Sequence, residues 1–257
     1  MTDPQRKRPP RFKRGVAILP SLFTTANLFL GFWAIIRTIN GQYAEAAPLL
    51  LGAMVLDMLD GRIARLTGTA SEFGGELDSL ADVISFGVAP ALLVYRWGFG
   101  SLPRYGWLVA FLFLMCGTFR LARFNVQRSA VDGRYFVGLP IPAAAAPIAA
   151  VVWFLEKPLE DRTHGTLALV SVMALAFLMV STLRYQSFKN VDLRRRRNYT
   201  NLLGIAIMLG VIALHPEAVM LAIASLYALS GPVAYVISLV TRRRGDPPPV
   251  VAASEAH

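Results

Sequence analysis

Long apolar stretches recur along the whole chain, and short polar clusters separate them. The pattern predicts an all-α, polytopic membrane protein with about eight transmembrane helices, because a helix needs roughly 20 apolar residues to cross a bilayer. Six or seven helices are the alternative, since His215-Pro216 interrupts the last pair and Pro140 and Pro142 crowd the start of the fifth. The stretches run at about 16–36, 44–66, 76–96, 106–124, 137–155, 164–183, 200–214 and 217–240.

Composition and charge support this class. The chain is 55% apolar and only 16% charged, which is too apolar for an ordinary soluble domain of 257 residues. Its net charge of +10 comes from clusters in the polar connections, a pattern that favours a membrane surface and excludes nucleic acid as the expected partner. With eight helices most Lys and Arg residues fall on one side, so both termini are predicted to be cytoplasmic.

The chain is expected to form a single membrane domain over residues 1–244. A basic segment at 1–15 precedes the first apolar stretch, and the tail 245–257, rich in Pro and Ala, is expected to be disordered. The one cysteine, Cys116, excludes a disulfide within the chain.

Four carboxylates stand at the facing ends of the second and third predicted helices. Asp57 and Asp60 are three residues apart and Asp78 and Asp82 four apart, so each pair shares one helix face. A short loop joins the helices, and the two pairs are expected to face each other. Carboxylates near lipid are costly unless cations, water or polar partners compensate them. This set of hard oxygen ligands suits Mg²⁺, Mn²⁺ or Ca²⁺.

The residues beside the acids allow two interpretations. Arg62 and Arg65 would neutralise two of the carboxylates if they formed interfacial ion pairs. Gly61 and Gly74 leave the backbone open beside the acids, either for a phosphate group or for close helix packing. Carboxylates, glycines and Arg65 together favour phosphate binding, with Arg65 holding the anionic group.

This segment resembles the signature of the CDP-alcohol phosphatidyltransferases, with Asp57 three residues ahead of it. The resemblance implies that a CDP-linked lipid binds over a two-metal site, and that an alcohol hydroxyl attacks the β-phosphorus and releases CMP. It implies Mg²⁺ or Mn²⁺ ligated by Asp57, Asp60, Asp78 and Asp82, with Asp82 also the general base. The matching residues are Asp60-Gly61-x2-Ala64-Arg65-x8-Gly74-x3-Asp78-x3-Asp82.

The same resemblance implies a site for CDP-diacylglycerol. Pro20 and Thr24 on the first helix would lie near the cytidine, while Ser21 stands where relatives often have Asn, so the base or ribose contacts differ there. The positions that match the nucleotide-binding residues are Pro20, Thr24, Gly61, Ala64, Arg65, Ser71 and Gly74.

Further stretches resemble the phosphatidylserine synthase branch of the family and extend the resemblance over about residues 15–190. The branch implies transfer of a phosphatidyl group to L-serine. The stretches are Asn27-Leu-Phe-Leu-Gly31, Phe119-Arg120-Leu-Ala-Arg123-Phe124-Asn125-Val126, Phe136-x-Gly138-Leu-Pro140-x-Pro142-Ala143-Ala144 and Met179-Val-Ser181-x2-Arg184-Tyr185-x-Ser187-Phe188-Lys189.

A serine site needs a cation for the carboxylate and an acceptor for the ammonium group. Asn125 and Ser181 are the candidate acceptors, and Asn27 is a further candidate that would otherwise be a satisfied core amide. The basic candidates would otherwise be orienting charges at helix ends. They are Arg120, Arg123, Arg184 and Lys189.

Other functions remain open at this point. Glycerol 3-phosphate would suit the same basic residues, and choline would favour an aromatic cage from Tyr135, Phe136 and Tyr185. A cation-coupled transporter would also place acids within helices, although the chain shows no matching second half. A lipid-sensing protein would explain the basic connections but would leave the four facing carboxylates unexplained.

The resemblance also carries expectations about the protein's surroundings. It implies a homodimer in a prokaryotic inner membrane, with the active site facing the cytoplasm. The expected partners are CDP-diacylglycerol, L-serine and membrane lipids.

Overall fold

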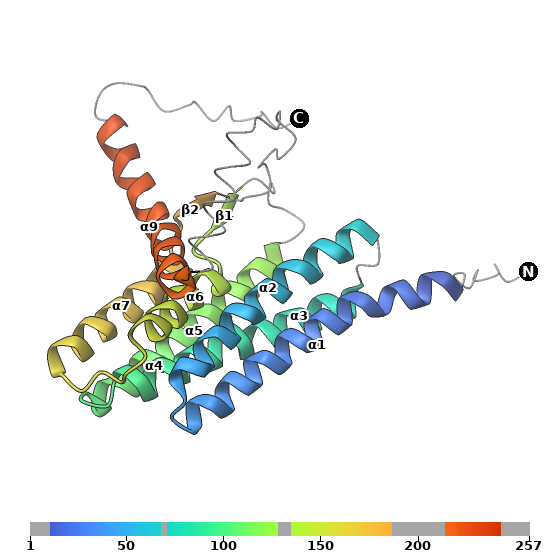
Figure 1. Ribbon diagram of the computed structural model, residues 1–257. Helices are drawn as coiled ribbons and strands as arrows, with labels where there is room; N and C mark the ends of the chain where they lie inside the picture. The colour runs from blue at the N-terminus through green and yellow to red at the C-terminus, as the bar shows by residue number, and fades with distance from the viewer. Residues whose placement is uncertain (1–10, 68–70, 128–134, 187–213, 243–257) are drawn as a thin grey trace, which may run out of the picture.

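The computed structural model describes residues 11–67, 71–127, 135–186 and 214–242. Within these ranges the chain is a helical bundle with one small antiparallel sheet (Figure 1). The helical class is confirmed, while two strands of three residues each were not expected. The elements are α1 (Arg11–Ile39), α2 (Tyr43–Thr67), α3 (Glu72–Asp82), the π-helix η1 (Val83–Val88), α4 (Ala89–Gly98), α5 (Pro103–Gln127), β1 (Tyr135–Val137), α6 (Ile141–Leu155), α7 (Arg162–Val180), β2 (Arg184–Gln186) and α9 (Pro216–Arg242).

Helices α1 and α2 form a tight hairpin and lie side by side along their length (Figure 1). Gly41, in the turn between them, has a φ of +76°, a conformation that favours glycine. Ala46, Ala47 and Ala53 of α2 are fully buried, and small side chains of this kind let two helices approach closely. The hairpin thereby fixes the position of α2 against α1.

The third predicted helix is one continuous run, α3–η1–α4, that contains a π-helical turn. The Ala89 N–H donates to the Ile84 carbonyl oxygen, five residues back rather than four. Ser85, Phe86 and Gly87 of this turn are buried. The turn begins directly after Asp82, so its packing determines how that carboxylate is held.

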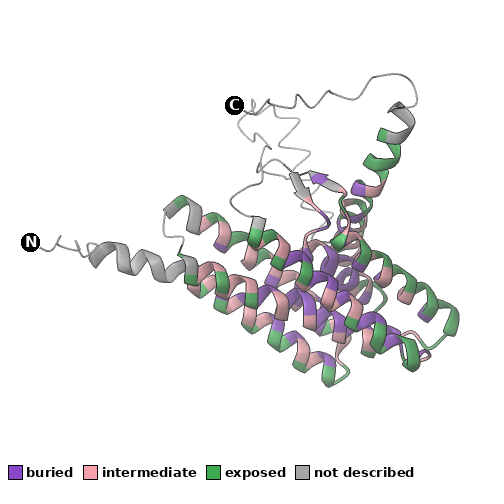
Figure 2. Ribbon diagram, turned by 180° about the vertical axis from the view of Figure 1, so that it is seen from behind, coloured by how far each residue is buried: buried purple, intermediate pink, exposed green. Residues whose placement is uncertain are grey.

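Helix α6 is largely buried and packs against α2 and α9, and Figure 2 shows buried residues gathered in the middle of the bundle. The expectation that this helix begins at residue 137 is wrong, because β1 pairs Val137 with Arg184 of β2. Gly138 then has a φ of +78°, and a Cβ there would lie 2.3 Å from the Met179 carbonyl oxygen. The helix can therefore begin only after this turn, at Ile141.

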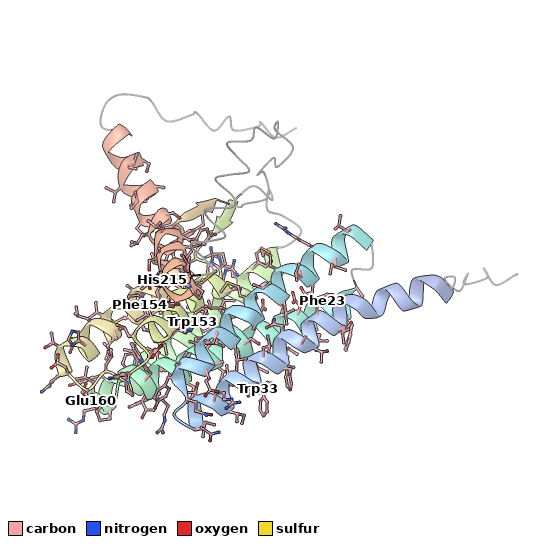
Figure 3. The ribbon with its side chains drawn as sticks, in the orientation of Figure 1. Phe23, Trp33, Trp153, Phe154, Glu160 and His215 are labelled. Carbon is pink, nitrogen blue, oxygen red and sulfur yellow. The ribbon has the colours of Figure 1, made fainter. Side chains whose placement is uncertain are left out.

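Five helical segments among the described residues are long and apolar enough to cross a membrane. Helix α2 is long enough but carries several charged residues, α6 has 15 residues, and the predicted span 200–214 lies outside the described residues. Trp33 and Phe154 are among many large apolar side chains exposed on the outside of the bundle (Figure 3). The protein is an integral membrane protein, and the count of eight spans stays a prediction.

Two expected terminal features lie wholly or partly beyond the described residues. The tail 245–257 is outside them, and so is most of the basic segment 1–15.

Candidate active site

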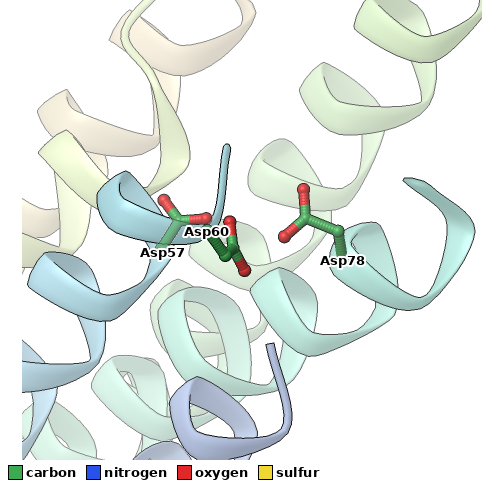
Figure 4. A group of neighbouring side chains, drawn as sticks. All are labelled: Asp57, Asp60 and Asp78. Atoms are coloured by element: carbon green, nitrogen blue, oxygen red, sulfur yellow. The ribbon is translucent and has the colours of Figure 1, made fainter. Parts of the chain in front are cut away.

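Three carboxylates converge between α2 and α3. Asp57 and Asp60 lie one turn apart on α2, and Asp78 comes from α3, which packs against α1 (Figure 4). One carboxylate oxygen from each lies within 4.8 Å of those from the other two. The predicted facing of the two acidic helices is therefore present in the structure for these three residues.

Asp60 is held by groups from its own helix and from α1. Its side chain is 4% exposed, and the Thr24 hydroxyl donates a hydrogen bond of 2.9 Å to Oδ2. The Gly61 backbone N–H also donates to this carboxylate. Thr24, expected near the cytidine, thus also orients a carboxylate of the acidic cluster.

Asp82 lies beside this group, at the end of α3. It is 8% exposed and close enough to Asp57, Asp78 and Asp60 for electrostatic repulsion among the carboxylates. Its Oδ1 has no hydrogen-bond partner among the described residues. A buried carboxylate oxygen left in this state is suited to bind a cation or to accept a proton.

The position of Asp82 depends on close packing between α1 and η1. The Ser85 hydroxyl donates to the Asn27 carbonyl oxygen at 3.2 Å. A Cβ on Gly31 would lie 2.2 Å from Ser85 Oγ and 2.7 Å from Ser85 Cα. Only glycine therefore allows the π-helical turn to lie this close to α1.

Asn27, one of the predicted serine contacts, lies in the same seam between α1 and η1. Asn27 is fully buried, and neither Oδ1 nor Nδ2 of its side-chain amide has a hydrogen-bond partner among the described residues. A buried amide in this state does not fit the alternative of a satisfied core residue.

The donor set fits a divalent metal. Carboxylate oxygens are the ligands that Mg²⁺, Mn²⁺ and Ca²⁺ prefer, and Asp57, Asp60 and Asp78 offer them at short mutual distances. The ion-pair alternative gains no support from Arg62, which is exposed and makes no ion pair with the described residues.

The predicted nucleotide positions are only partly described. A Cβ on Gly61 would meet no atom within 4 Å, so the protein's own packing does not require glycine there. Ser71 is the N-cap of α3, with its hydroxyl accepting from the Gly74 N–H at 3.0 Å. The side chains of Pro20, Ala64 and Arg65 lie outside the described part of the structure.

Arg120 is the more buried of the two basic serine-site candidates whose side chains the structure describes, Arg120 and Arg123. It is 8% exposed within α5, rather than at a helix end, and its guanidinium lies over the Phe124 ring at 5.4 Å. It is close enough to Asp82 for electrostatic attraction. Among the described residues, however, it makes no ion pair within 4.0 Å. A buried cation in this state is suited to bind an anionic group of a substrate.

The other candidates for the serine site differ in their hydrogen bonds and in their burial. The Asn125 amide nitrogen donates to Ser79 Oγ on α3 at 2.8 Å, and Arg123 is half-buried. The Ser181 hydroxyl donates to the Leu178 carbonyl oxygen at 2.8 Å, at the end of α7. The side chains of Arg184 and Lys189 are not among those described.

Sequence reasoning missed Tyr227 of α9. The centroids of the Tyr227 and Tyr185 rings lie 5.8 Å apart, and Tyr227 is close enough to Arg120 for an electrostatic interaction. Burial raises the pKa of Tyr185 to about 12, so its hydroxyl remains a donor at neutral pH. That hydroxyl donates to the Ala228 carbonyl oxygen at 3.2 Å. A tyrosine far along the chain from every motif gave no signal in the sequence.

Comparison with known proteins adds independent information. The family described as CDP-alcohol phosphatidyltransferase matches residues 17–182. A Helicobacter pylori protein named CDP-diacylglycerol--serine O-phosphatidyltransferase is 38% identical over 225 residues, which cover 87% of this chain and 93% of the relative. Proteins of the same name from Methanocaldococcus jannaschii and Bacillus subtilis are 31% and 33% identical, covering 87% and 66% of this chain and 96% and 91% of the relatives.

Proposed function

Because the chain belongs to the CDP-alcohol phosphatidyltransferase family, we propose that it transfers the phosphatidyl group of CDP-diacylglycerol to the hydroxyl of L-serine. The products are phosphatidylserine and CMP. The observation that carries this proposal is the convergence of Asp57, Asp60 and Asp78, with Asp82 beside them, inside the segment that matches the family. The names of the relatives support serine as the acceptor.

In the proposed reaction Asp82 takes the proton from the serine hydroxyl as its oxygen attacks the β-phosphorus. A new P–O bond to serine forms, the P–O bond of the anhydride breaks, and CMP leaves with the bonding electrons. The burial of Asp82 beside three other carboxylates suits it to accept a proton. No covalent intermediate with the protein is needed.

Asp57, Asp60, Asp78 and Asp82 would hold the divalent metals, two per active site, as Mg²⁺ or Mn²⁺. When bound, these ions neutralise the charge on the phosphoryl oxygens and align the serine hydroxyl with the β-phosphorus. Thr24 contributes by fixing the orientation of Asp60 through the 2.9 Å hydrogen bond. Gly61, with open space where a Cβ would be, leaves room for a phosphate group to approach.

The proposal places serine against Arg120. The buried guanidinium would bind the serine carboxylate, and its place beside Asp82 would bring the serine hydroxyl to the base. Asn27, Arg123, Asn125, Ser181, Arg184 and Lys189 remain candidates for the rest of the serine site, and Pro20, Thr24, Ala64, Arg65, Ser71 and Gly74 for the CDP-diacylglycerol site.

We also propose that both termini are cytoplasmic and that the active site opens to the cytoplasm of a prokaryotic cell. The excess of Lys and Arg in alternate connections supports this orientation. A homodimer remains a proposal from family resemblance.

The first experiment compares acceptors. Purified protein receives CDP-diacylglycerol, Mn²⁺ or Mg²⁺, and serine, glycerol 3-phosphate or choline, while CMP release and the lipid product are followed. We expect product with serine only, and none when a chelator removes the metal. Product with another alcohol would overturn serine but keep the metal site. Metal flux across sealed vesicles without CMP release would favour a transporter.

Replacing Arg120 with Lys is expected to raise the KM for serine about 10-fold, because lysine keeps the charge but loses the planar pair of donors that matches a carboxylate. Steady-state kinetics with varied serine measure the effect. Arg104→Lys is the matched control, since Arg104 is exposed at the opposite end of α5. A serine KM that matches wild type in Arg120→Lys would remove Arg120 from the serine site.

A further inference from the structure

Tyr185 holds α9 against the bundle. Tyr185 is fully buried, and its hydroxyl donates to the Ala228 carbonyl oxygen on α9. A Cβ on Gly231 would lie 2.4 Å from the Tyr185 ring, so glycine is required for this contact. Figures 1 and 2 show α9 lying across the bundle near β2 and then projecting away from it, with exposed residues towards its far end. The turn of α9 that contains Ala228 is therefore fixed in place.

This contact places Tyr227 within electrostatic range of Arg120. The ring of Tyr227 lies 5.8 Å from that of Tyr185, at an angle of 40° between their planes. Arg120 is within electrostatic range both of Tyr227 on α9 and of Asp82 on α3. The phenol on α9 and the proposed base on α3 thus each lie within electrostatic range of the buried guanidinium on α5.

The chemistry of this group suits an amino acid with a free carboxylate. Arg120 is buried, with its charge uncompensated by any ion pair among the described residues. A phenol hydroxyl beside a guanidinium adds a donor that a carboxylate accepts. Choline, a cationic alcohol, offers no anionic group to this pair.

We propose that Tyr227 is a specificity-determining residue of the acceptor site, and that its hydroxyl and Arg120 together bind the carboxylate of the amino-acid acceptor. The inference rests on the proposed function. Tyr227 lies outside residues 17–182, which match the family. That position fits a role in selecting the acceptor rather than in the chemistry that the family shares.

The test is Tyr227→Phe, which keeps the ring and its packing on Tyr185 but removes the hydroxyl. We expect the KM for serine to rise about 10-fold, as for the loss of one hydrogen bond to a charged group, while the KM for CDP-diacylglycerol stays within 2-fold of wild type. Tyr235→Phe is the matched control, because Tyr235 is 53% exposed two turns further along the same helix. It should match wild type in both constants.

A second readout compares serine with serinamide, which lacks the carboxylate. Wild type should prefer serine by kcat/KM, and Tyr227→Phe should reduce that preference about 10-fold. The proposal would be overturned if the ratio of kcat/KM for serine to that for serinamide equalled the wild-type ratio, or if the KM rose equally for serine and for CDP-diacylglycerol.

If Tyr227→Phe does not fold, Tyr227→His and Tyr227→Met replace it. The same ratio of kcat/KM for serine to that for serinamide is measured, and a wild-type ratio in a folded variant counts against the proposal. Wild-type protein without serine-dependent CMP release would instead overturn the proposed function.

Discussion

Asp82→Asn is expected to lower the turnover number for CMP release by roughly 10³-fold, because asparagine has the same shape but cannot take the proton from the attacking hydroxyl. The measurement is CMP release with saturating CDP-diacylglycerol, serine and metal, on protein with the wild-type thermal transition. Glu76→Gln is the matched control, since Glu76 is an exposed carboxylate on the same helix, α3. Turnover within 10-fold of wild type in Asp82→Asn would show that another group takes the proton.

The metal dependence of Asp82→Asn separates the two roles proposed for this residue. If Asp82 acts chiefly as the base, the metal concentration that gives half-maximal activity should stay near the wild-type value while turnover falls. If it acts chiefly as a ligand, that concentration should rise at least 10-fold. The comparison measures residual activity over a Mn²⁺ titration. Asp78→Asn is the reference for the loss of a metal-binding carboxylate, because Asp78 belongs with Asp57 and Asp60 to the group whose oxygens lie within 4.8 Å of one another.

Gly31→Ala is expected to lower the free energy of unfolding by about 3 kcal/mol, at the upper end of what overpacking usually costs. The new Cβ would lie 2.7 Å from Ser85 Cα, so backbone has to move, not only a side-chain end. Moving η1 away from α1 also moves Asp82, and activity should fall in the fraction that stays folded. Thermal unfolding in detergent and turnover per folded molecule measure the two effects.

Gly52→Ala is the control for that substitution, because it adds the same methyl group to the neighbouring helix. Its Cβ would lie 3.3 Å from Leu30 Cδ1, the end of a flexible side chain that can give way. We expect a loss below about 1 kcal/mol and activity close to wild type. Equal stability and activity in Gly31→Ala and Gly52→Ala would mean that the seam between α1 and η1 does not hold Asp82.

The sequence predicted the helical class and the convergence of three carboxylates, for identifiable reasons. Apolar stretches long enough to cross a bilayer leave few alternatives to a helix. Spacings of three and four residues place carboxylates on one face, and a short loop brings two such faces together. Asp57, Asp60 and Asp78 therefore converge as predicted from spacing.

Features that depend on contacts distant in sequence were not predicted. The π-helical turn after Asp82 has no signature in the apolar run, because its extra residue is accommodated by packing against Gly31. Arg120 looked like a charge at a helix end, but α5 continues to Gln127 and buries it. The contact of Tyr227 with this region depends on how β2 holds α9, which no local pattern encodes.

The close hairpin of α1 and α2 has a consequence for how the protein enters the membrane during synthesis. Asp57 and Asp60 make α2 a poor span by itself, since a carboxylate within a translocating helix opposes insertion, by roughly 3 kcal/mol when it lies at the helix centre and by less towards an end. Helix α1 is apolar enough to insert alone, and the short turn at Gly41 delivers α2 directly against it. The hydroxyl of Thr24 then meets Asp60 as the pair forms. The carboxylates proposed to bind metal thus make the second helix depend on the first for its place in the bilayer, and α1 acts as an insertion partner before it contributes to the proposed binding site.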